Sequence, residues 1–559
     1  MRRLFKFLSF LLMLIILFSL SSCFWSKVND NDIELEEKNV EFNNLSEDYN
    51  IKDSNVNLYF YKGGNVPFIN IESYYNMLDG YYELSKKEVS ISENFNRLYI
   101  VDKSQSLIRT IFDWRYNTIT FKNELSPYGM KSSEKTDFTS YYDCKLVKPI
   151  VSLEIEYYIG DYGIDILYNN GNVLIPINIL NIINASYYNV IYNGEKLYGF
   201  YYDDNLDNVY DVKLVGEKVP DDIVEESNNE LFFLLNEKFG LKNYYNVTDY
   251  KSYISKEVID ALKSNDAEIR NDALISVINK ILDDPHSRMI NSSLYSTNKE
   301  NLLNRKYYNS DSRTIRVGTI INQLMNQDKL SEKGDKPIYY KGDTLFITFS
   351  QFLVGKNDEV YESKGVYKED AYLKDTAALF YKALNDCKNN HSEVKNVVLD
   401  ISYNGGGYVA AMYRALTFLS DNDIYFGYSV GKDATEIYNL TGDPDMDGNY
   451  DSDAFSNYNF YILQSEGTFS AANAFVAIAR YSGVCKTIGK RSGGGMCPVM
   501  PYILTDGTQF TISDSSQQNA IRLSHDKYYV YEIESGAPVD IELDYSDFNN
   551  LDKIIELIN

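Results

Sequence analysis

The sequence predicts a layered α/β domain with a largely parallel sheet in the C-terminal half of the chain. Short apolar segments alternate there with amphipathic ones, which is the pattern of strands joined by helices. The strands are expected over 343–352, 396–402, 459–464 and 484–490, and the helices over 373–390, 408–420 and 471–483. Ligands of such sheets gather at the carboxyl ends of the strands. We therefore expect the chemistry of this chain at that edge.

Three small or polar clusters directly follow predicted strands. They are Asn404–Gly407, Ser470 and Gly493–Gly495. Because parallel strands end at one edge of a sheet, we expect these clusters to lie close together. The side-chain-free Gly405-Gly406-Gly407 stretch lets backbone N–H groups approach a substrate oxygen. A tight turn is the alternative role of such glycines.

Ser470 lies between an apolar strand and the helix that starts at Ala471. A hydroxyl at this junction can face a cleft, where the unpaired N–H groups of the helix favour an anion. This is the arrangement of a nucleophilic serine with half of an oxyanion hole. A helix cap is the commoner role of a single serine at such a position.

The chain before the α/β domain divides into two parts. Residues 55–215 alternate in short strands with Asn-Gly turns at 170–171 and 193–194, which predicts an α+β accessory domain. Two stretches, 63–78 and 170–185, resemble each other weakly and suggest a duplicated unit. Residues 220–290 have helical periodicity and end at Pro285. A polar linker and a strand pair near 314–342 are expected to open the α/β domain, assigned to 291–559.

Residues 1–22 have the basic, apolar and small-residue regions of a secretory signal. The stretch Leu20-Ser21-Ser22-Cys23 resembles the lipobox of bacterial lipoproteins, which implies cleavage before Cys23 and acylation of its thiol. An uncleaved anchor helix is the alternative. Residues 23–54 are acidic and rich in Asn, so we expect a flexible tether. Both alternatives place the protein outside the cytoplasm, attached to the cell membrane.

Charge and cysteine content limit the class of partner. The 559 residues have a formal net charge of −26, which argues against nucleic acid and against a broad basic face for anionic lipid. The cysteines after Cys23 show no zinc-ligand spacing, so no metal is expected. Cys485 and Cys497 could pair in an exported protein, or both could be unpaired thiols.

The order of several segments resembles serine peptidase family S41, which includes the carboxy-terminal processing proteases and the tricorn core protease. The segments are LDDPHSRM (282–289), TLFITFSQF (344–352), VVLDISYNGGG (397–407), SEGTFSAANAF (465–475), CKTIGKRSGGG (485–495) and ESGAPVDIEL (534–543). The resemblance implies a ClpP/crotonase-like fold, peptide or protein substrates and no cofactor. It makes Ser470 the nucleophile and the backbones of Gly405, Gly406 and Ala471 the oxyanion donors.

The residue at the position of the general base differs from that of the processing proteases. Their lysine falls on Gly495 here, so a Ser-Lys dyad would need Lys490 or Lys486 in another geometry. The tricorn-like branch instead uses a histidine, which falls on His286. A neutral imidazole can accept the proton of a serine hydroxyl near neutral pH.

The other members of the relay are also implied by the tricorn-like branch. Ser287 is expected to assist in orienting the imidazole. Glu534 or Glu532 is expected to complete the relay, with Glu534 slightly favoured. His391 and His525 rank below His286 as the base.

Two functions follow from this reading. The first is an exported, membrane-anchored serine endopeptidase with Ser470 as nucleophile and His286 as base. The second is a catalytically inactive S41-like surface lipoprotein that binds peptides or cell-envelope material. The missing lysine motivates this alternative.

Overall fold

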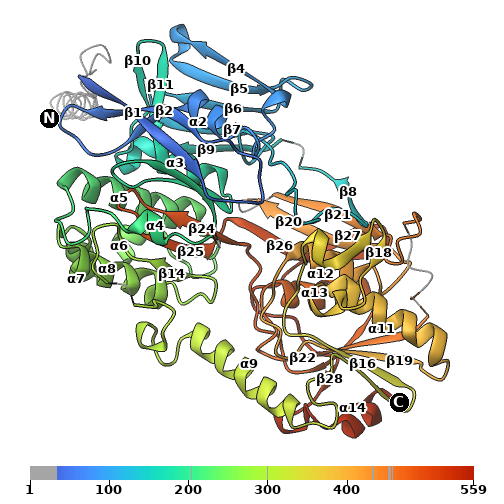
Figure 1. Cartoon of the computed structure of the whole chain (residues 1–559). Helices are drawn as coiled ribbons and strands as arrows, with labels where there is room; N and C mark the ends of the chain where they lie inside the picture. Colours follow the sequence, from blue (N-terminus) through green and yellow to red (C-terminus); the bar gives the residue numbers. More distant parts are fainter. Residues whose placement is uncertain are drawn as a thin grey trace, which may run out of the picture.

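The computed structural model describes residues 34–150, 152–202, 204–298, 300–430, 434–450, 455 and 457–559 (Figure 1). The expected signal peptide and Cys23 lie outside these residues. Within them, no helix is both long and apolar enough to cross a membrane.

The C-terminal half is built on a six-stranded sheet. Its order is β15 (Ile338–Lys341), β16 (Thr344–Thr348), β19 (Asn396–Asp400), β22 (Asn459–Gln464), β23 (Lys486–Gly489) and β28 (Ile541–Glu542). The strands from β16 to β28 are parallel, and β15 is antiparallel at one edge. The predicted α/β class is therefore confirmed. The central strands are buried on both faces, which explains their uninterrupted apolar runs.

Helices cover both faces of this sheet, in agreement with Figure 1. One face packs against α11 (Thr376–Asn390), α12 (Val409–Leu416) and α13 (Ala471–Ser482), and the other against α9 (Arg313–Lys329) and α14 (Leu551–Ile558). Successive residues of β16 point to opposite faces of the sheet. Leu345 and Ile347 pack on the side of α11, α12 and α13, and Phe346 packs on the side of α9 and α14.

The strand pair expected near 314–342 is wrong over its first part, because residues 313–329 form the helix α9. The Ser312 hydroxyl accepts the N–H of Ile315 (3.3 Å) and caps the helix. Ile320, Ile321 and Leu324 lie on one face of the helix and pack on the sheet. The β-branched residues Thr314, Ile315 and Val317 favour a strand by propensity, but packing of this stripe prevails.

Two smaller sheets adjoin the parallel one. A five-stranded sheet runs β27 (Lys527–Glu532), β26 (Ser516–Ser524), β20 (Ile424–Val430), β21 (Ala434–Gly442) and β8 (Tyr142–Lys148). A three-stranded sheet runs β14 (Arg288–Asn291), β25 (Gln509–Ser513) and β24 (Val499–Ile503). The short elements α10 (Asn357–Val360), β17 (Tyr361–Ser363) and β18 (Val366–Tyr367) lie between β16 and α11 in sequence. Because β8 comes from the expected accessory region, that region is joined to the C-terminal half by backbone pairing.

The N-terminal region contains two further sheets. The first has the order β10 (Leu167–Asn169), β11 (Asn172–Pro176), β3 (Phe68–Asn70), β2 (Ser54–Tyr61), β1 (Leu35–Asn44), β13 (Leu197–Tyr201) and β12 (Tyr188–Tyr192). The second has the order β4 (Lys87–Ser92), β5 (Arg97–Asp102), β6 (Arg109–Asp113), β7 (Thr118–Lys122) and β9 (Glu154–Tyr158). The two similar stretches form β3 with α2 (Ile71–Met77) and β11 with α3 (Ile177–Asn184), and β3 pairs with β11.

The flexible tether expected over 23–54 is wrong from Leu35 on, because β1 pairs with both β2 and β13. Val40 and Phe42 are buried at alternate positions of an otherwise acidic strand. The strand lies between β2 and β13 in the sheet, and burial of one face fixes its register. The accessory region therefore includes this strand.

The segment expected to be helical, 220–290, consists of short helices. They are α5 (Asp221–Phe233), α6 (Tyr250–Tyr253), α7 (Lys256–Leu262) and α8 (Ala267–Ile275), and both α5 and α8 continue into a π-helical turn. The helix α4 (Asp207–Tyr210) precedes them. Cys144, Cys387, Cys485 and Cys497 are all free thiols, so Cys485 and Cys497 are not paired.

Candidate active site

Ser470 stands in the turn between β22 and α13, at the carboxyl edge of the parallel sheet. Its backbone has φ 57° and ψ −126°, a sparsely populated conformation for a residue with a side chain. Its side chain makes no capping hydrogen bond to α13. The hydroxyl lies 2.8 Å from Nε2 of His286 instead. This geometry favours the nucleophile over the cap as the role of the residue.

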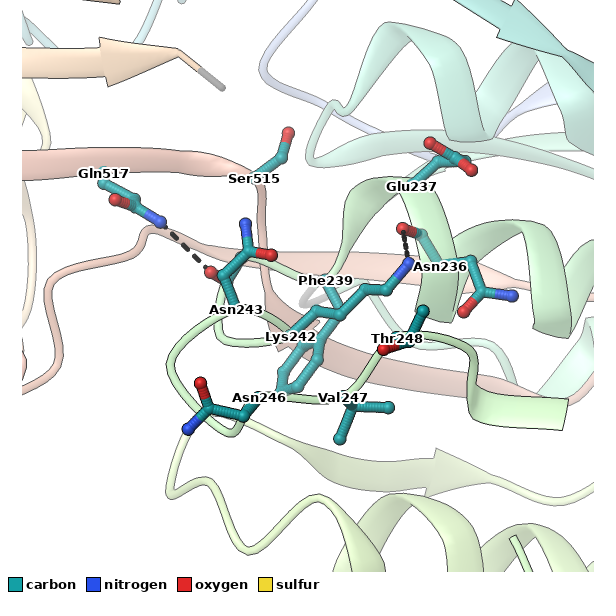
Figure 2. A pocket seen from close by; sticks show the side chains of 11 residues that line it. Asn236, Glu237, Phe239, Lys242, Asn243, Asn246, Val247, Thr248, Ser515 and Gln517 are labelled. Carbon is teal, nitrogen blue, oxygen red and sulfur yellow. Dashed lines mark hydrogen bonds between the residues drawn. The ribbon is translucent and has the colours of Figure 1, made fainter. Parts of the chain in front are cut away.

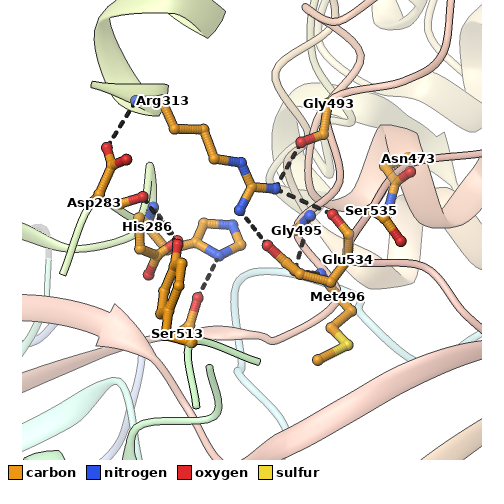
Figure 3. Close-up of polar contacts among 12 residues, drawn as sticks. Asp283, His286, Arg313, Asn473, Gly493, Gly495, Met496, Ser513, Glu534 and Ser535 are labelled. Carbon is orange, nitrogen blue, oxygen red and sulfur yellow. Dashed lines mark hydrogen bonds and ion pairs between the residues drawn. The ribbon is translucent and has the colours of Figure 1, made fainter. Parts of the chain in front are cut away.

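The register between β14 and β25 brings His286 to this turn. Arg288 pairs with Thr511, so His286, two residues earlier, lies opposite Ser513, two residues later. The Ser513 hydroxyl is 3.0 Å from Nδ1 of the imidazole (Figure 3). The ring packs at 4.8 Å on the ring of Phe469, and the residue is 7% exposed. Both ring nitrogens thus face hydroxyl groups.

Burial lowers the pKa of His286 to about 4. The nearby Asp284 carboxylate acts in the opposite direction, whereas the charges of Arg313 and Arg288 lower the pKa further. The imidazole is therefore neutral at pH 7, as a proton acceptor must be.

The glycine loop after β19 meets the serine turn. Gly406 is so close to it that a Cβ there would lie 2.7 Å from Cβ of Ser470 and 3.2 Å from the nitrogen of Ala471. The Gly406 N–H donates to Oδ1 of Asn404 (2.9 Å), so the expected oxyanion donor is engaged within its own loop. Among the described residues, the N–H groups of Gly405 and Ala471 have no acceptor.

Glu534 is buried near the imidazole but makes no hydrogen bond to it. One carboxylate oxygen forms an ion pair with Arg313, and the other accepts the N–H groups of Gly495 (3.1 Å) and Met496 (2.8 Å) (Figure 3). Glu532 has an exposed side chain and accepts the N–H of Glu534 and the Ser535 hydroxyl (3.1 Å). The structure therefore places neither glutamate on the imidazole.

Ser287 also does not contact the imidazole. Its hydroxyl donates to Oδ2 of Asp284 (2.8 Å), and Asp284 accepts the backbone N–H of His286 (3.2 Å). Ser513 stands where an assisting serine was expected. Ser513 lies in strand β25, and no local signal in the sequence distinguishes it from other strand serines.

The alternative bases lie elsewhere. Lys490 binds Glu542 (3.2 Å) and Asp544 (2.9 Å) at the surface, and Lys486 is exposed. The ring of His391 stacks on Tyr340 at 3.9 Å, and His525 contacts the neighbouring Ser524 hydroxyl. Of these four side chains and His286, only His286 is hydrogen-bonded to Ser470.

Two other features could hold a ligand. A polar pocket of about 650 Å³ lies between residues 236–248 and the side chains of Ser515 and Gln517 (Figure 2). This pocket is next to the candidate active site, because the N–H of Gly240, which lines it, donates to the carbonyl of Ser513 (3.0 Å).

Three carboxylates lie close together in the loop after β21. The ligand oxygens of Asp443, Asp445 and Asp447 lie within 4.8 Å of one another. Such a cluster has cation-ligand chemistry, but it was not among the sites expected from the sequence.

Comparison with known proteins agrees with this geometry. The model of peptidase family S41 matches residues 346–533, which include Ser470, the glycine loop and Ser513. No curated protein matches the sequence.

Partial matches to solved structures were also found. The photosystem II D1 C-terminal processing protease is 18% identical with a TM-score of 0.26, and the match covers 36% of this chain and 42% of that protein. A lipoprotein from Streptococcus agalactiae is 14% identical with a TM-score of 0.33, covering 61% of this chain and 97% of that protein. The tricorn protease is 18% identical with a TM-score of 0.23, covering 44% and 20% respectively.

The match over residues 346–533 indicates a region of the serine-peptidase family S41. The chain spans less than half of the length of the D1 processing protease that it matches, 42%.

Proposed function

We propose that this protein is a serine endopeptidase that uses Ser470 as nucleophile and His286 as general base. The observation that carries the proposal is the 2.8 Å contact between Oγ of Ser470 and Nε2 of His286. A nucleophile within hydrogen-bond distance of a neutral base is the basic requirement for acyl transfer through serine.

The contact with Ser513 is compatible with the tautomer that this reaction needs. With the Nδ1 proton donated to the Ser513 hydroxyl, the lone pair of Nε2 faces Ser470. Nε2 then takes the hydroxyl proton as Oγ attacks the peptide carbonyl. The protonated imidazole returns the proton to the leaving amine, and water later hydrolyses the acyl-enzyme by the same two transfers.

The tetrahedral intermediate needs donors for its oxyanion. The N–H of Ala471 opens the buried helix α13, and the N–H of Gly405 lies in the loop that contacts the serine turn. Both donors are backbone groups and require no reorganisation during the reaction. The N–H of Gly406 would serve only after releasing Asn404.

A hydroxyl, not a carboxylate, holds the imidazole. It cannot offset the charge of the imidazolium as an aspartate does, and burial also disfavours that charge. We therefore expect a weakly basic imidazole and modest turnover. This feature also favours the alternative of a protein that binds peptides on an S41 scaffold without cleaving them.

Labelling with a fluorophosphonate separates the two. The wild type should be labelled and should hydrolyse an unfolded protein substrate, whereas Ser470→Ala should do neither. His286→Ala should lose turnover per folded molecule while the protein still folds. Absence of labelling in the wild type, or labelling that persists in Ser470→Ala, would refute the peptidase proposal.

We also propose that the protein is exported and anchored through lipid on Cys23. The basic residues Arg2 and Arg3, the apolar run after them and the stretch Leu20–Cys23 support this. Cells fed a tagged fatty acid should incorporate it into the wild type. Incorporation that continues in Cys23→Ser would contradict the assignment.

A further inference from the structure

Arg313 is the first residue of α9, and its side chain is 13% exposed. Its backbone N–H donates to Oδ1 of Asp283 (2.7 Å), which fixes the start of the helix. Its guanidinium forms an ion pair with Glu534 through Nη1 and donates to the carbonyl of Gly493 through Nη2 (2.7 Å) (Figure 3). Nη2 also reaches the carbonyl of Glu534 (3.3 Å). One side chain thus joins α9 to two segments distant in sequence.

Glu534 extends these contacts to the glycine strip Gly493–Met496. Its carboxylate is fully buried and uses one oxygen for Arg313 and the other for the N–H groups of Gly495 and Met496. Burial raises the pKa of Glu534, and Arg313 opposes that rise. A carboxylate offers about four acceptor directions, and a guanidinium and two N–H donors occupy three of them here. Neither oxygen is hydrogen-bonded to the imidazole.

The other edge of the strip holds the nucleophile. The N–H of Ser470 donates to the carbonyl of Gly494 (2.8 Å), and the N–H of Gly493 donates to the carbonyl of Thr468 (2.8 Å). The strip therefore lies between the Arg313–Glu534 pair and the backbone of the serine turn. Unusual backbone angles such as those of Ser470 persist only where the surroundings impose them.

Arg313 reaches the base as well. Its guanidinium lies 5.5 Å from the centre of the Phe469 ring, and the His286 imidazole packs on the same ring. The charged groups that act on the imidazole are Asp284, Arg288 and Arg313. Loss of Arg313 would disturb the packing of the base and remove a charge that keeps it neutral.

We propose that Arg313 is a positioning residue of this site. Through its ion pair with Glu534 it braces the glycine strip and so holds Ser470 and His286 in register, and Glu534 acts as an anchor of that strip instead of a member of a relay. This inference rests on the proposed peptidase function.

The test compares Arg313→Met, Arg313→Lys and Glu534→Gln in the full chain. Arg316→Met is the matched control, because Arg316 lies on the same helix in a largely exposed ion pair with Glu466 (3.4 Å). The measurements are kcat, KM and the rate of fluorophosphonate labelling per folded molecule, at several pH values.

Arg313→Met should lower kcat and the labelling rate about 100-fold with KM nearly unchanged, since misplacement of catalytic groups by about 1 Å costs that much. Arg313→Lys should recover part of the loss, because an ammonium keeps the charge without the planar fork. The acid limb of the pH profile should move up in Arg313→Met. Glu534→Gln should lose about 10-fold, and the double variant should be no worse than Arg313→Met.

The remaining outcomes distinguish failure of the proposed function from failure of this inference. If the wild type is not labelled, the proposed function fails. If the wild type is labelled and Arg313→Met matches it per folded molecule, Arg313 is only structural and this inference fails. If Glu534→Gln is as inactive as His286→Ala while Arg313→Met is near wild type, Glu534 is a relay carboxylate and the inference fails.

Discussion

Gly406→Ala tests how closely the glycine loop and the nucleophile must approach. The added Cβ would lie 2.7 Å from Cβ of Ser470 and 3.0 Å from the carbonyl oxygen of Phe469. Buried residues lie behind both atoms and limit how far they can move. Ordinary contact begins near 3.4 Å, so the serine and the loop must separate by about 0.7 Å. Displacement by about 1 Å costs roughly 100-fold in rate, and we expect a loss in kcat/KM of about 30-fold to 100-fold.

The same change strains the backbone, because φ of Gly406 is 112°. That strain should lower the free energy of unfolding by about 1–3 kcal/mol. Gly405→Ala is the matched control, since its Cβ would meet only a methyl of Ile321 at 3.5 Å. Both variants keep every backbone N–H. Kinetics of peptide hydrolysis and fluorophosphonate labelling, corrected for folded fraction, compare them. Equal activities of the two variants would refute the reasoning.

Three further predictions concern protonation and hydrogen bonding. The pKa of His286 is lowered to about 4, so kcat/KM should stay level through neutral pH. It should fall as the pH approaches 4, because Nε2 then becomes protonated. A fall in kcat/KM near pH 6.5 would contradict this. Ser513→Ala should reduce kcat/KM about 10-fold with little change in thermal midpoint, as expected for one hydrogen bond to the imidazole, and unchanged turnover would exclude the orienting role. Burial raises the pKa of Glu226, and that of Glu230 to about 8, so the folded state keeps protons that the unfolded chain releases near pH 4.5. Stability to urea should therefore fall as the pH rises from about 4.5 to 8, and Glu226→Gln should reduce this fall; an unchanged slope would contradict it.

The parallel sheet was predictable because its strands are buried on both faces. The runs 397–399 and 460–463 are continuously apolar, without the alternation of half-exposed strands. Parallel topology then places the turns after these strands at one edge, which brings the glycine loop to Ser470 without any further information. This proximity and the resemblance to family S41 together identified Ser470 as the candidate nucleophile.

The residues that support the base were not predictable in the same way. Ser513 faces His286 only because β14 pairs with β25 in one register, and a pairing between strands more than 200 residues apart leaves no local mark. Arg313 could not be identified from the sequence for a different reason. It opens a helix whose β-branched residues favour a strand by propensity, so the side chain was not placed at the site. In both cases tertiary contacts decide what local preference leaves open.

The surroundings of Gly495 leave no room for the lysine of a Ser-Lys dyad. A Cβ at Gly495 would lie 2.8 Å from the ring of Phe469 and 2.9 Å from the nitrogen of Ser470, and φ there is 90°. A lysine at this position would push the serine turn away from the strip that holds it. The glycine strip contacts the serine turn directly through its backbone, and the proposed base approaches Ser470 from another element. The β14–β25 pair supplies one, with His286 held opposite Ser513. The absence of a lysine at position 495 and the buried histidine beside Ser470 thus fit one packing arrangement.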